Sequence, residues 1–577
     1  MRKPTKKEIN LALNSFSKKD RLIFFSFAAI FVICAVFIFK QINDKFLVEV
    51  PTQGGTLTEG VIGEAPRFIN PLLATSDADR DLTELIYSGL LRVDDNGQYI
   101  PDLAESYDIS KDGLIYTFTI KKNAVWQDGK PITADDVEFT IQKAKDPAIK
   151  SYKRPGFEGV QVIKIDDKTI SFKLKQPYSP FLENTTLGIL PKHIWKDVDA
   201  ETFAYSKFNM EPIGSGPYML SYISTKSSGS GTSGISLLPD YYDLKPFKYF
   251  TLGEPMIEKL RIRFYKNEED LLVAYHSGDI DAMNTVPPIT AQKLELQGIK
   301  ITRNTLPRVF AIFFNQNHSK VLADKTVRRA LDLVTSRSEV VQNVLLGYGT
   351  EISGPVPSIE YRNSTTTTSI NLAAAKNLLT KGGWKFNTKK NLWEKIVKKQ
   401  PTLTLAFDIA TADTPELKSA AETIKKSWEE LGAKINLRVY EIGDLNQNII
   451  RPRKYDALFF GEIIGRNPDL FSFWHSSQRN DPGLNISMYA NSKADKFLNL
   501  VRTEQDPVKK IKELSDLQKE IANDLPAIFV YSPEFLYTVP KNIKDIRIAN
   551  ISVPSDRFLY IYKWYIDTDK IWKIFAK

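Results

Sequence analysis

The amino-acid sequence predicts an α/β fold that is built from more than one domain. The first observation is length, because 577 residues are too many for a single hydrophobic core. The second is the alternation, beyond about residue 305, of short apolar runs with helical patterns, which indicates a mixed, largely parallel sheet covered by helices. The third is composition: 42% apolar and 25% charged residues are typical of a globular protein.

Residues 305–357 carry the clearest strand and helix signals. Residues 309–314 form an uninterrupted apolar run that ends in polar residues, which predicts a strand buried on both faces. Ser336 and Glu339 have the spacing of a capping box and predict the start of a later helix. Another helix is predicted between the strand and Ser336, because apolar residues recur at i, i+3, i+4 and i+7, namely Val327, Ala330, Leu331 and Val334.

Further strands and helices are predicted between residue 403 and the end of the chain. Strands are predicted at 403–410, 434–442 and 455–463, and a pair of strands at 527–539. Thr414-Pro415 and Asp506-Pro507 each predict a helix start. Stretches rich in Ser and Thr at 224–236 and 364–369 predict loops. The inward face of the last long helix is predicted to contain Ile511, Leu514, Leu517 and Ile521.

The N-terminus contains a candidate membrane anchor. Residues 22–39 are 18 residues long, apolar except for Ser26, and bounded by Arg21 and Lys40. Basic residues crowd the N-terminal side, so the first twenty residues are expected in the cytoplasm and the rest outside. A cleaved signal peptide is the alternative, but no small-residue cleavage site follows, and Ile33 before Cys34 does not fit a lipoprotein signal. We expect an uncleaved anchor.

Charge and residue counts argue against several functions. Seven basic and two acidic residues among the first 21 account for most of the net charge of +9, so no nucleic-acid binding is expected. The four histidines are far apart in the sequence and there is one cysteine, so neither a metal site nor any cofactor is expected. Asp77, Asp79 and Asp81 are interpreted as helix N-terminal acids, because the glycine and glutamate of a calcium loop are missing.

An enzyme is not expected. The chain lacks a GxSxG elbow and a metal-binding histidine pair. Any two of the 69 acidic residues could meet in the fold, so a hydrolase stays open as an alternative.

Several stretches resemble one protein family. They are residues 69–107, WQDGKPITADDVEFTI (126–141), PIGSGPY (212–218), SGDIDAM (277–283) and residues 305–357. In this order, from about residue 55 to 540, they resemble the peptide/oligopeptide class (family 5) of extracytoplasmic solute-binding proteins of ABC transporters. The resemblance implies a bilobed periplasmic-binding-protein-like fold (class II, peptide-binding type) with an extra small domain, here following an N-terminal transmembrane helix.

The resemblance also implies domain boundaries. Residues 1–21 are expected to be a cytoplasmic basic segment, 22–40 the anchor and 41–54 a tether. The first lobe is expected at 55–89 and 205–304, interrupted by the additional small domain at 90–204. The second lobe is expected at 305–524, and residues 525–577 should return to the first lobe and form a tail.

Residues 461–478 are the candidate binding segment, because polar and aromatic side chains crowd a turn after a predicted strand. Open α/β sheets bind ligands at the carboxyl ends of their strands. We predict that Glu462, Arg466, Asn467 and Trp474 bind ligand. The competing interpretation is that Trp474 belongs to the core and that Arg466 is a solvated side chain.

The resemblance adds further candidates: Arg67, Phe68, Asn70, Asn315, Gln316 and Tyr531. For Tyr531 a core position is the alternative. Family members that bind peptides hold the free α-amino group with an aspartate in the turn, whereas this chain has Gly465 and Arg466 there and its first acid at Asp469. Glu462 would replace that aspartate, or the ligand is not a free peptide.

The predicted function is that of a membrane-anchored, extracytoplasmic, monomeric solute-binding protein. It would capture a peptide or similar small solute between two lobes and deliver it to the permease subunits of an ABC importer. The alternatives are a surface-anchored binder of an oligosaccharide or metallophore, and a surface hydrolase.

Overall fold

The structure, a computed structural model, describes residue 5 and residues 15–228, 236–357, 370–397 and 401–572. It consists of two compact units. The first contains residues 1–55 and 565–577, and the second contains residues 56–564. The predicted loop at 364–369 lies outside the described residues. Of the loop predicted at 224–236, residues up to 228 belong to a strand and 229–235 are outside the described part.

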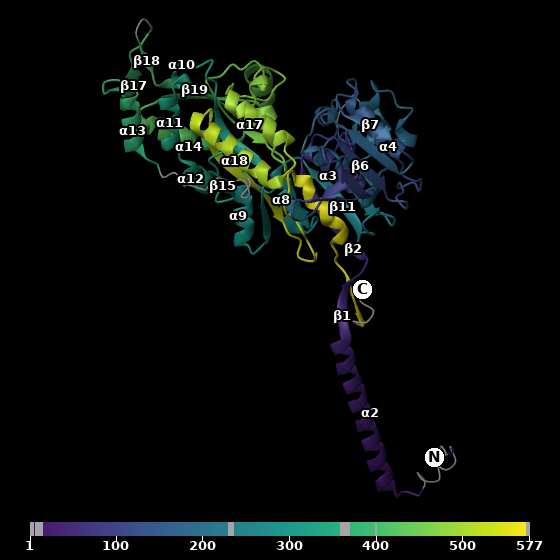
Figure 1. Cartoon of the computed structure of the whole chain (residues 1–577). Helices are drawn as coiled ribbons and strands as arrows, with labels where there is room; N and C mark the ends of the chain where they lie inside the picture. The colour runs from purple at the N-terminus through teal and green to yellow at the C-terminus, as the bar shows by residue number, and fades with distance from the viewer. Residues whose placement is uncertain (1–4, 6–14, 229–235, 358–369, 398–400, 573–577) are drawn as a thin grey trace. The chain divides into compact units, whose positions relative to one another are not determined.

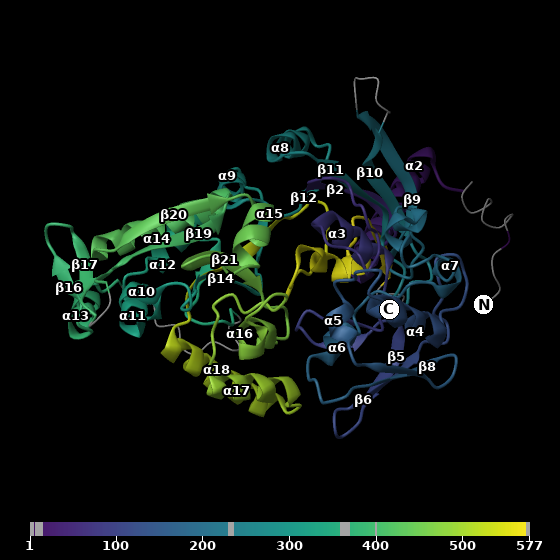
Figure 2. The ribbon, with the colours of Figure 1, turned by 90° about the horizontal axis from the view of Figure 1, so that it is seen from above.

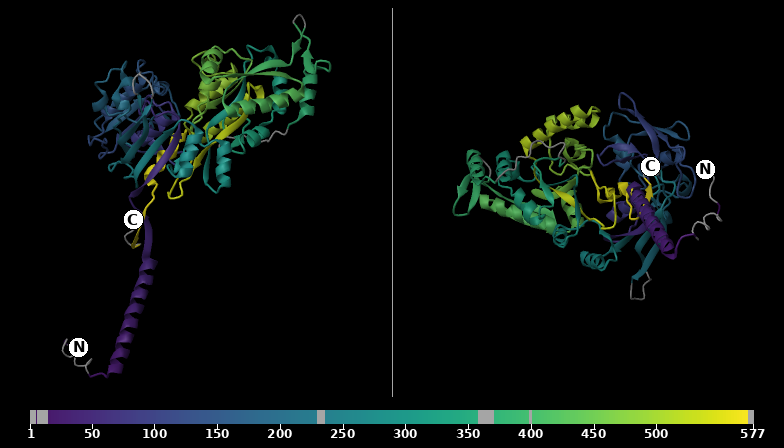
Figure 3. Two further views of the ribbon diagram at one scale, coloured as in Figure 1. Left: turned by 180° about the vertical axis from the view of Figure 1, so that it is seen from behind. Right: turned by 90° about the horizontal axis from the view of Figure 1, so that it is seen from below.

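The first unit is a long helix followed by a two-stranded ribbon. Helix α2 (Lys18–Phe46) contains 26 residues, Lys18–Asn43, that are long and apolar enough to cross a membrane. Its apolar side chains are exposed throughout. Strand β1 (Leu47–Pro51) follows directly and pairs antiparallel with β23 (Thr568–Trp572) near the end of the chain (Figures 1 and 3).

The second unit begins with a five-stranded sheet in the order β12-β2-β11-β10-β9. Its strands are β2 (Gly54–Ile62), β9 (Tyr218–Ser228), β10 (Ser236–Pro246), β11 (Ile257–Tyr265) and β12 (Ala282–Met283). The associated helices are α3 (Asp77–Ile86), α8 (Glu268–Ser277) and α9 (Pro288–Leu296). Asp79, interpreted as a helix N-terminal acid, completes a capping box with Ser76 in α3, and Asn267 caps α8.

A separate antiparallel sheet lies within residues 90–204, in the order β5-β6-β8-β7. The strands are β5 (Ala104–Ile109), β6 (Ile115–Ile120), β7 (Gln161–Lys164) and β8 (Thr169–Lys173), preceded by the ribbon β3 (Leu91–Val93) and β4 (Tyr99–Pro101). Helices α4 (Ala134–Lys145), α5 (Arg154–Phe157), α6 (Phe181–Asn184) and α7 (Lys192–Trp195) and the 3-10 turns η1 (Phe203–Tyr205) and η2 (Lys207–Asn209) accompany it.

The largest sheet has seven strands, in the order β13-β22-β14-β21-β19-β20, with β15 also paired to β22. They are β13 (Ile301–Thr305), β14 (Arg308–Phe314), β15 (Gly349–Glu351), β19 (Ala406–Ala412), β20 (Lys434–Tyr440), β21 (Ala457–Ile463) and β22 (Ala527–Thr538). The prediction of a largely parallel sheet is wrong: only β19 pairs in parallel, with β20 and β21, whereas β14 is antiparallel to both its neighbours. Both neighbours of β14 come from far along the sequence, and local apolar runs carry no information about the direction of such pairings.

Helices and a small three-stranded sheet accompany the large sheet. The longer helices are α11 (Lys325–Leu333), α13 (Leu372–Lys381), α14 (Pro415–Leu431), α17 (Ser492–Thr503) and α18 (Pro507–Asp524), of which α17 and α18 lie side by side (Figure 2). Shorter elements are α10 (Lys320–Ala323), α12 (Arg337–Glu339), η3 (Val340–Val344), β16 (Lys385–Asn387), β17 (Leu392–Lys395), β18 (Leu403–Thr404), α15 (Ile442–Asp444), η5 (Leu445–Ile450), α16 (Phe471–Trp474) and η6 (Ser476–Gln478).

Three local predictions differ from the structure. Ser336 forms no capping box with Glu339, because its hydroxyl lies 3.4 Å from that of buried Ser427 and no cap hydrogen bond is made. Ile511 is 37% exposed, although the other three residues predicted on its face of α18 are buried. Residues 527–538 form one continuous strand, β22, because different parts of it pair with β13, β14 and β15.

A fully buried ion cluster joins the beginning of the second unit to its end. Arg557, in the 3-10 helix η7 (Pro554–Lys563), donates from Nε to Glu59 Oε1 at 3.0 Å and from Nη1 to Asp81 Oδ1 at 2.8 Å. Tyr537 of β22 donates its hydroxyl to Glu59 Oε2 at 3.0 Å. Burial raises the pKa of both carboxyls, and the guanidinium opposes that rise. Asp81, predicted as a helix-start acid, is instead part of this cluster.

Replacing Arg557 with methionine tests the importance of this cluster. The Arg557→Met variant should lose about 3–5 kcal/mol of unfolding free energy, because two carboxylates remain buried without their cation. Urea unfolding followed by circular dichroism measures the loss. Arg547→Met is the matched control, since Arg547 pairs with Asp545 at the surface and should change stability little. Equal effects of the two substitutions would contradict this account.

Candidate functional site

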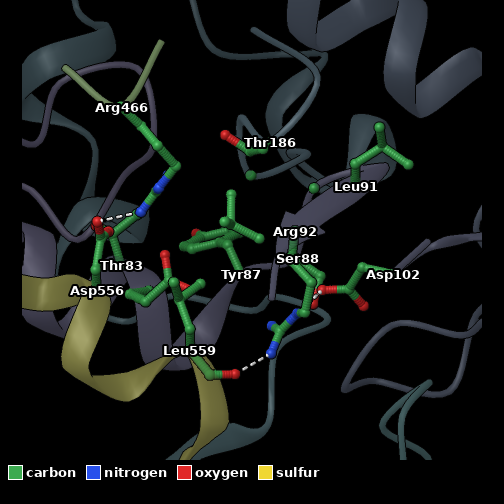
Figure 4. A pocket seen from close by; sticks show the side chains of 14 residues that line it. Thr83, Tyr87, Ser88, Leu91, Arg92, Asp102, Thr186, Arg466, Asp556 and Leu559 are labelled. Atoms are coloured by element: carbon green, nitrogen blue, oxygen red, sulfur yellow. Dashed lines mark hydrogen bonds and ion pairs between the residues drawn. The ribbon is translucent and has the colours of Figure 1, made fainter. Parts of the chain in front are cut away.

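A small polar cavity lies where α3, β3 and η7 meet the loop that follows β21. Its volume is about 70 Å³. Thr83, Glu84 and Tyr87 line it from α3 and its C-terminal end, Asp556 from η7, and Arg466 from the β21 loop. Figure 4 shows Arg466 entering from one side and Arg92 from the other, with Thr83 and Tyr87 between them. Segments from both halves of the chain therefore build the cavity.

Arg466 closes the cavity by an ion pair across these segments. Its Nη2 donates to Asp556 Oδ2 at 2.6 Å, and its Nε donates to the carbonyl of Asn550 at 3.1 Å (Figure 4). Both charged side chains are largely buried. Asp556 also accepts the backbone N–H of Ser552 at 2.7 Å, which fixes the carboxylate in place. The pair thus joins the large-sheet segment to the C-terminal segment.

A second ion pair forms the opposite wall. Arg92 of β3 donates from Nε to Asp102 Oδ2 at 2.8 Å, and both residues are almost fully buried. A further Arg92 nitrogen donates to the carbonyl of Leu559, and Thr251 donates to Asp102 at 2.7 Å. Arg92 and Asp102 are therefore neutralised by each other.

The acid of Glu84 is left without such a partner. Within the described residues its carboxyl makes no hydrogen bond, and burial raises its pKa to about 8, with Arg92 opposing the rise. The buried hydroxyls of Thr83 and Tyr87 also find no partner among the described residues. Thr83 and Tyr87 are four positions apart, so they share one side of the helix end. The cavity therefore contains three unsatisfied polar groups, which is unusual for a protein interior.

A second set of contacts extends from the same loop to residues 178–179. Tyr178 donates its hydroxyl to Asp469 Oδ2 at 3.1 Å, and Arg502 donates to the same oxygen at 3.0 Å. Lys510 donates to Ser179 Oγ and to Asn467 Oδ1, each at 2.8 Å, and burial lowers the pKa of Lys510 to about 8. Asp469 is therefore already engaged, and it is not a free anion in this turn.

The residues predicted in the β21 turn have different surroundings. Arg466 lines the cavity, and Asn467 lies beside it as the acceptor of Lys510. Glu462 is buried, neither of its carboxylate oxygens has a partner in the described part of the chain, and burial raises its pKa well above the ordinary value. It does not line the cavity. Trp474 is fully buried against the rings of Phe313 and Phe529, as the competing interpretation expected.

The candidates from the first loop and from β22 have local contacts. Arg67 is exposed and pairs with Glu64 at 3.1 Å, and Phe68 is half-buried. Asn70 is buried, donates to Asn209 Oδ1 at 3.0 Å and accepts from the backbone of Leu72, so it holds the loop. Tyr531 is 1% exposed and its ring stacks on that of Phe310 with 4.7 Å between centroids, which places it in the core.

Asn315 and Gln316 lie at the other end of the large sheet from Arg466. Because β14 and β21 are antiparallel, Phe314 faces Ala457 while Arg308 faces Ile463. Six residue steps separate these ends, about 20 Å along the strand. Asn315 donates to the carbonyl of Arg453 at 2.9 Å and holds the turn after β14. The structure therefore does not bring Asn315 and Gln316 together with Arg466.

Most of the cavity wall was not predicted from the sequence. Glu84, Thr83 and Tyr87 belong to the end of an amphipathic helix, where polar residues are normally solvated. Arg92 and Asp102 lie inside residues 69–107, one of the stretches that carried the family resemblance, and that signal could have drawn attention to them. Asp556 had no signal in the sequence.

Comparisons with known proteins agree with this fold. Residues 98–483 match the family described as bacterial extracellular solute-binding proteins, family 5. The oligopeptide-binding protein AppA of Bacillus subtilis is 28% identical over 540 residues, covering 89% of this chain and 92% of AppA. The dipeptide-binding protein of Escherichia coli is 24% identical, covering 83% and 90%.

Solved structures give the same result. That of Bacillus subtilis AppA in complex with a nonapeptide has a TM-score of 0.69 at 27% identity, covering 90% of this chain and all of that chain. That of the ABC transporter substrate-binding protein CtaP of Listeria monocytogenes has a TM-score of 0.74 at 25% identity, covering 89% and 100%. NikZ of Campylobacter jejuni in complex with Ni(L-His) has a TM-score of 0.69 at 26% identity, covering 88% and 99%.

These likenesses confirm the predicted bilobed α/β fold. The family match covers well over half of the chain and includes β4, the four-stranded sheet that follows it, and the β21 loop with Arg466. The chain belongs to the bacterial extracellular solute-binding proteins of family 5.

Proposed function

We propose that this protein is a monomeric, membrane-anchored receptor that captures a peptide outside the cytoplasm and delivers it to the permease of an ABC importer. The family membership and the peptide-binding relatives support this proposal. The observation that carries it is the cavity closed by Arg466, in which Glu84 has no counter-ion of its own. An enzymatic role has no support in the family.

Helix α2 supports the anchored arrangement. Its apolar segment is long enough to cross a bilayer, and the basic residues precede it. By the positive-inside rule, the second unit is then extracytoplasmic. A receptor held at the membrane surface needs no release step before it meets its permease.

The size of the cavity indicates which part of a ligand enters it. A volume of about 70 Å³ exceeds the ~30 Å³ that one water molecule occupies in the liquid but is far below the size of a drug-like ligand site. Only the end of a larger molecule fits. The main body of the ligand would therefore lie outside this cavity.

The charges of the cavity indicate that this end is cationic. Arg92 is neutralised by Asp102 and Arg466 by Asp556, so Glu84, once ionised, is the acid in excess. A primary ammonium group has three N–H donors. Thr83 Oγ1 and Tyr87 OH are acceptors without partners among the described residues, and the Glu84 carboxyl lines the cavity beside them. We infer that the α-ammonium group of a peptide enters here, in place of capture by an aspartate in the β21 turn.

Closure on the ligand is expected to depend on the Arg466–Asp556 pair. The pair bridges the large-sheet segment and η7, so separation of the two lobes would break it. A ligand drives closure only if its contacts are better in the closed state than in the open one. An ammonium group beside Glu84 meets this condition, because Arg466 then covers it from solvent.

Small-angle X-ray scattering tests the capture mechanism. Addition of a mixture of short peptides to the detergent-solubilised full chain should reduce its radius of gyration, as the lobes close. Oligosaccharides and nickel–histidine complexes are the control ligands, and their addition should leave the scattering unchanged. Compaction with one of these ligands alone would favour a non-peptide receptor, and peptide cleavage detected by mass spectrometry would favour a hydrolase.

The amino-terminal contact is tested by a Glu84→Gln variant. Its affinity for peptides should fall about 10–100-fold, the worth of a hydrogen bond to a charged group. Isothermal titration calorimetry measures the dissociation constants for free and N-acetylated peptides. The acetylated peptides should bind both proteins equally, and Glu64→Gln at the exposed loop is the control. Equal loss for both kinds of peptide would remove Glu84 from the ammonium contact while leaving peptide capture intact.

The pH dependence of binding provides an independent check. With a pKa of about 8, the Glu84 carboxyl is protonated at neutral pH in the empty cavity and must release its proton to hold an ammonium group. Affinity should therefore rise between about pH 6 and 8, then fall as the peptide amine deprotonates near its ordinary pKa of ~8. Glu84→Gln should abolish the rising limb. A wild-type affinity that is flat from pH 6 to 8 would contradict the assignment.

A further inference from the structure

One tryptophan differs from all the others in its exposure. The chain has eight tryptophans, and the seven other than Trp572 are at most 4% exposed. Trp572, at the end of β23, is 41% exposed. An exposed tryptophan at the last described position of the chain is not needed for the core of either unit.

The ribbon places Trp572 beside the end of the apolar helix. Strand β1 follows α2 directly, and in the antiparallel register Trp572 faces Leu47, the first residue after the helix. The indole Nε1 donates to Asn43 Oδ1, in the last turn of α2, at 2.8 Å. The C-terminal strand therefore returns to the point at which the helix ends.

The length of the helix locates this point relative to a bilayer. The apolar segment ends at Phe39, and Asn43 lies four residues further, about 6 Å along the helix axis. The headgroup region on each side of a bilayer is about 5–7 Å thick. Trp572 would thus lie at the level of the phospholipid headgroups. Phe39, Ile42 and Phe46 are exposed on the same stretch of α2.

The indole of Trp572 has the chemistry of a side chain that lies among phospholipid headgroups. Tryptophan is enriched at membrane interfaces because its ring is apolar and its N–H is polar. A ribbon of five residue pairs is also only marginally stable in water without another surface to support it. A bilayer surface at the end of α2 provides that support.

We propose that Trp572 and the end of β23 form a second membrane contact, in which the indole lies among the headgroups of the outer leaflet. The partner is the phospholipid surface itself. The proposal rests on the membrane anchoring of α2 in the proposed function. It means that both strands of the β1–β23 ribbon are held at the membrane.

Fluorescence quenching by brominated lipids tests this contact. The full chain is reconstituted in phosphatidylcholine vesicles, either unlabelled or carrying bromine near the headgroup end of the acyl chains or near the bilayer centre. Bromine near the headgroups should remove up to about one eighth of the total tryptophan emission, because one of the eight tryptophans is at that depth. Bromine at the bilayer centre should quench less. The variant Trp572→Phe keeps an apolar aromatic ring in the ribbon and should show no bromine-dependent loss.

The outcomes distinguish a failure of the proposed Trp572 contact from a failure of the membrane anchor on which it rests. Extraction of the full chain from vesicles by alkaline carbonate would show that α2 does not span the bilayer. If the chain resists extraction but bromine quenches wild type and Trp572→Phe equally, or neither, the proposed contact is overturned. The same result would follow if a second copy or another protein covered Trp572 and kept it from lipid.

Discussion

The fold of the second unit depends on the buried contact of Arg557 with Glu59 and Asp81. These residues are 498 and 476 positions from Arg557 in the sequence, yet all three side chains are fully buried. Removal of such charges from water is tolerated only when each is paired and hydrogen-bonded. The cluster satisfies this requirement with Tyr537 as a further donor. It therefore holds β2, α3 and η7 together with β22 in one arrangement.

Two of the elements that form the cluster, α3 and η7, also build the cavity. Asp81 lies within three residues of Thr83 and Glu84 on α3, and Arg557 directly follows Asp556 on η7. A shift of α3 against η7 that changed the spacing of Glu84 and Asp556 would also break hydrogen bonds between Arg557 and Asp81. Rigid support of this kind is what a binding site needs if its polar groups are to stay in fixed positions.

The sequence predicted local structure well and long-range pairing poorly. Strands β14, β19, β20 and β21 were predicted from apolar runs, because such a run can be recognised from neighbouring residues alone. The antiparallel direction of β14 was not, because it depends on pairing with β21 and β22, which come much later in the sequence. That single difference separates Asn315 and Gln316 from Arg466. Arg466 was predicted from its polar, aromatic turn, whereas Glu84 was not, since acids on amphipathic helices are usually solvated.

The ion cluster and the cavity differ in whether their acids are hydrogen-bonded. In the cluster both carboxylates accept hydrogen bonds from the guanidinium of Arg557. In the cavity each arginine already has its own aspartate, and within the described residues the carboxyl of Glu84 makes no hydrogen bond. A buried polar network that lacks one partner is destabilised, and a ligand that supplies the partner completes it. An acid without a hydrogen-bond partner thus distinguishes the cavity from the buried cluster.

The charges of the cavity also link ligand binding to closure of the lobes. Of the two arginines that line the cavity, Arg466 comes from the large-sheet segment, so its withdrawal on opening would leave Asp556 without this partner. In the proposed mechanism the open cavity would then be more negative than the closed one and would attract cationic groups more strongly from solution. Once an ammonium group had entered and Glu84 had released its proton, the return of Arg466 to Asp556 would neutralise the remaining charge and cover the ligand. These charges would therefore favour entry in the open state and retention in the closed state.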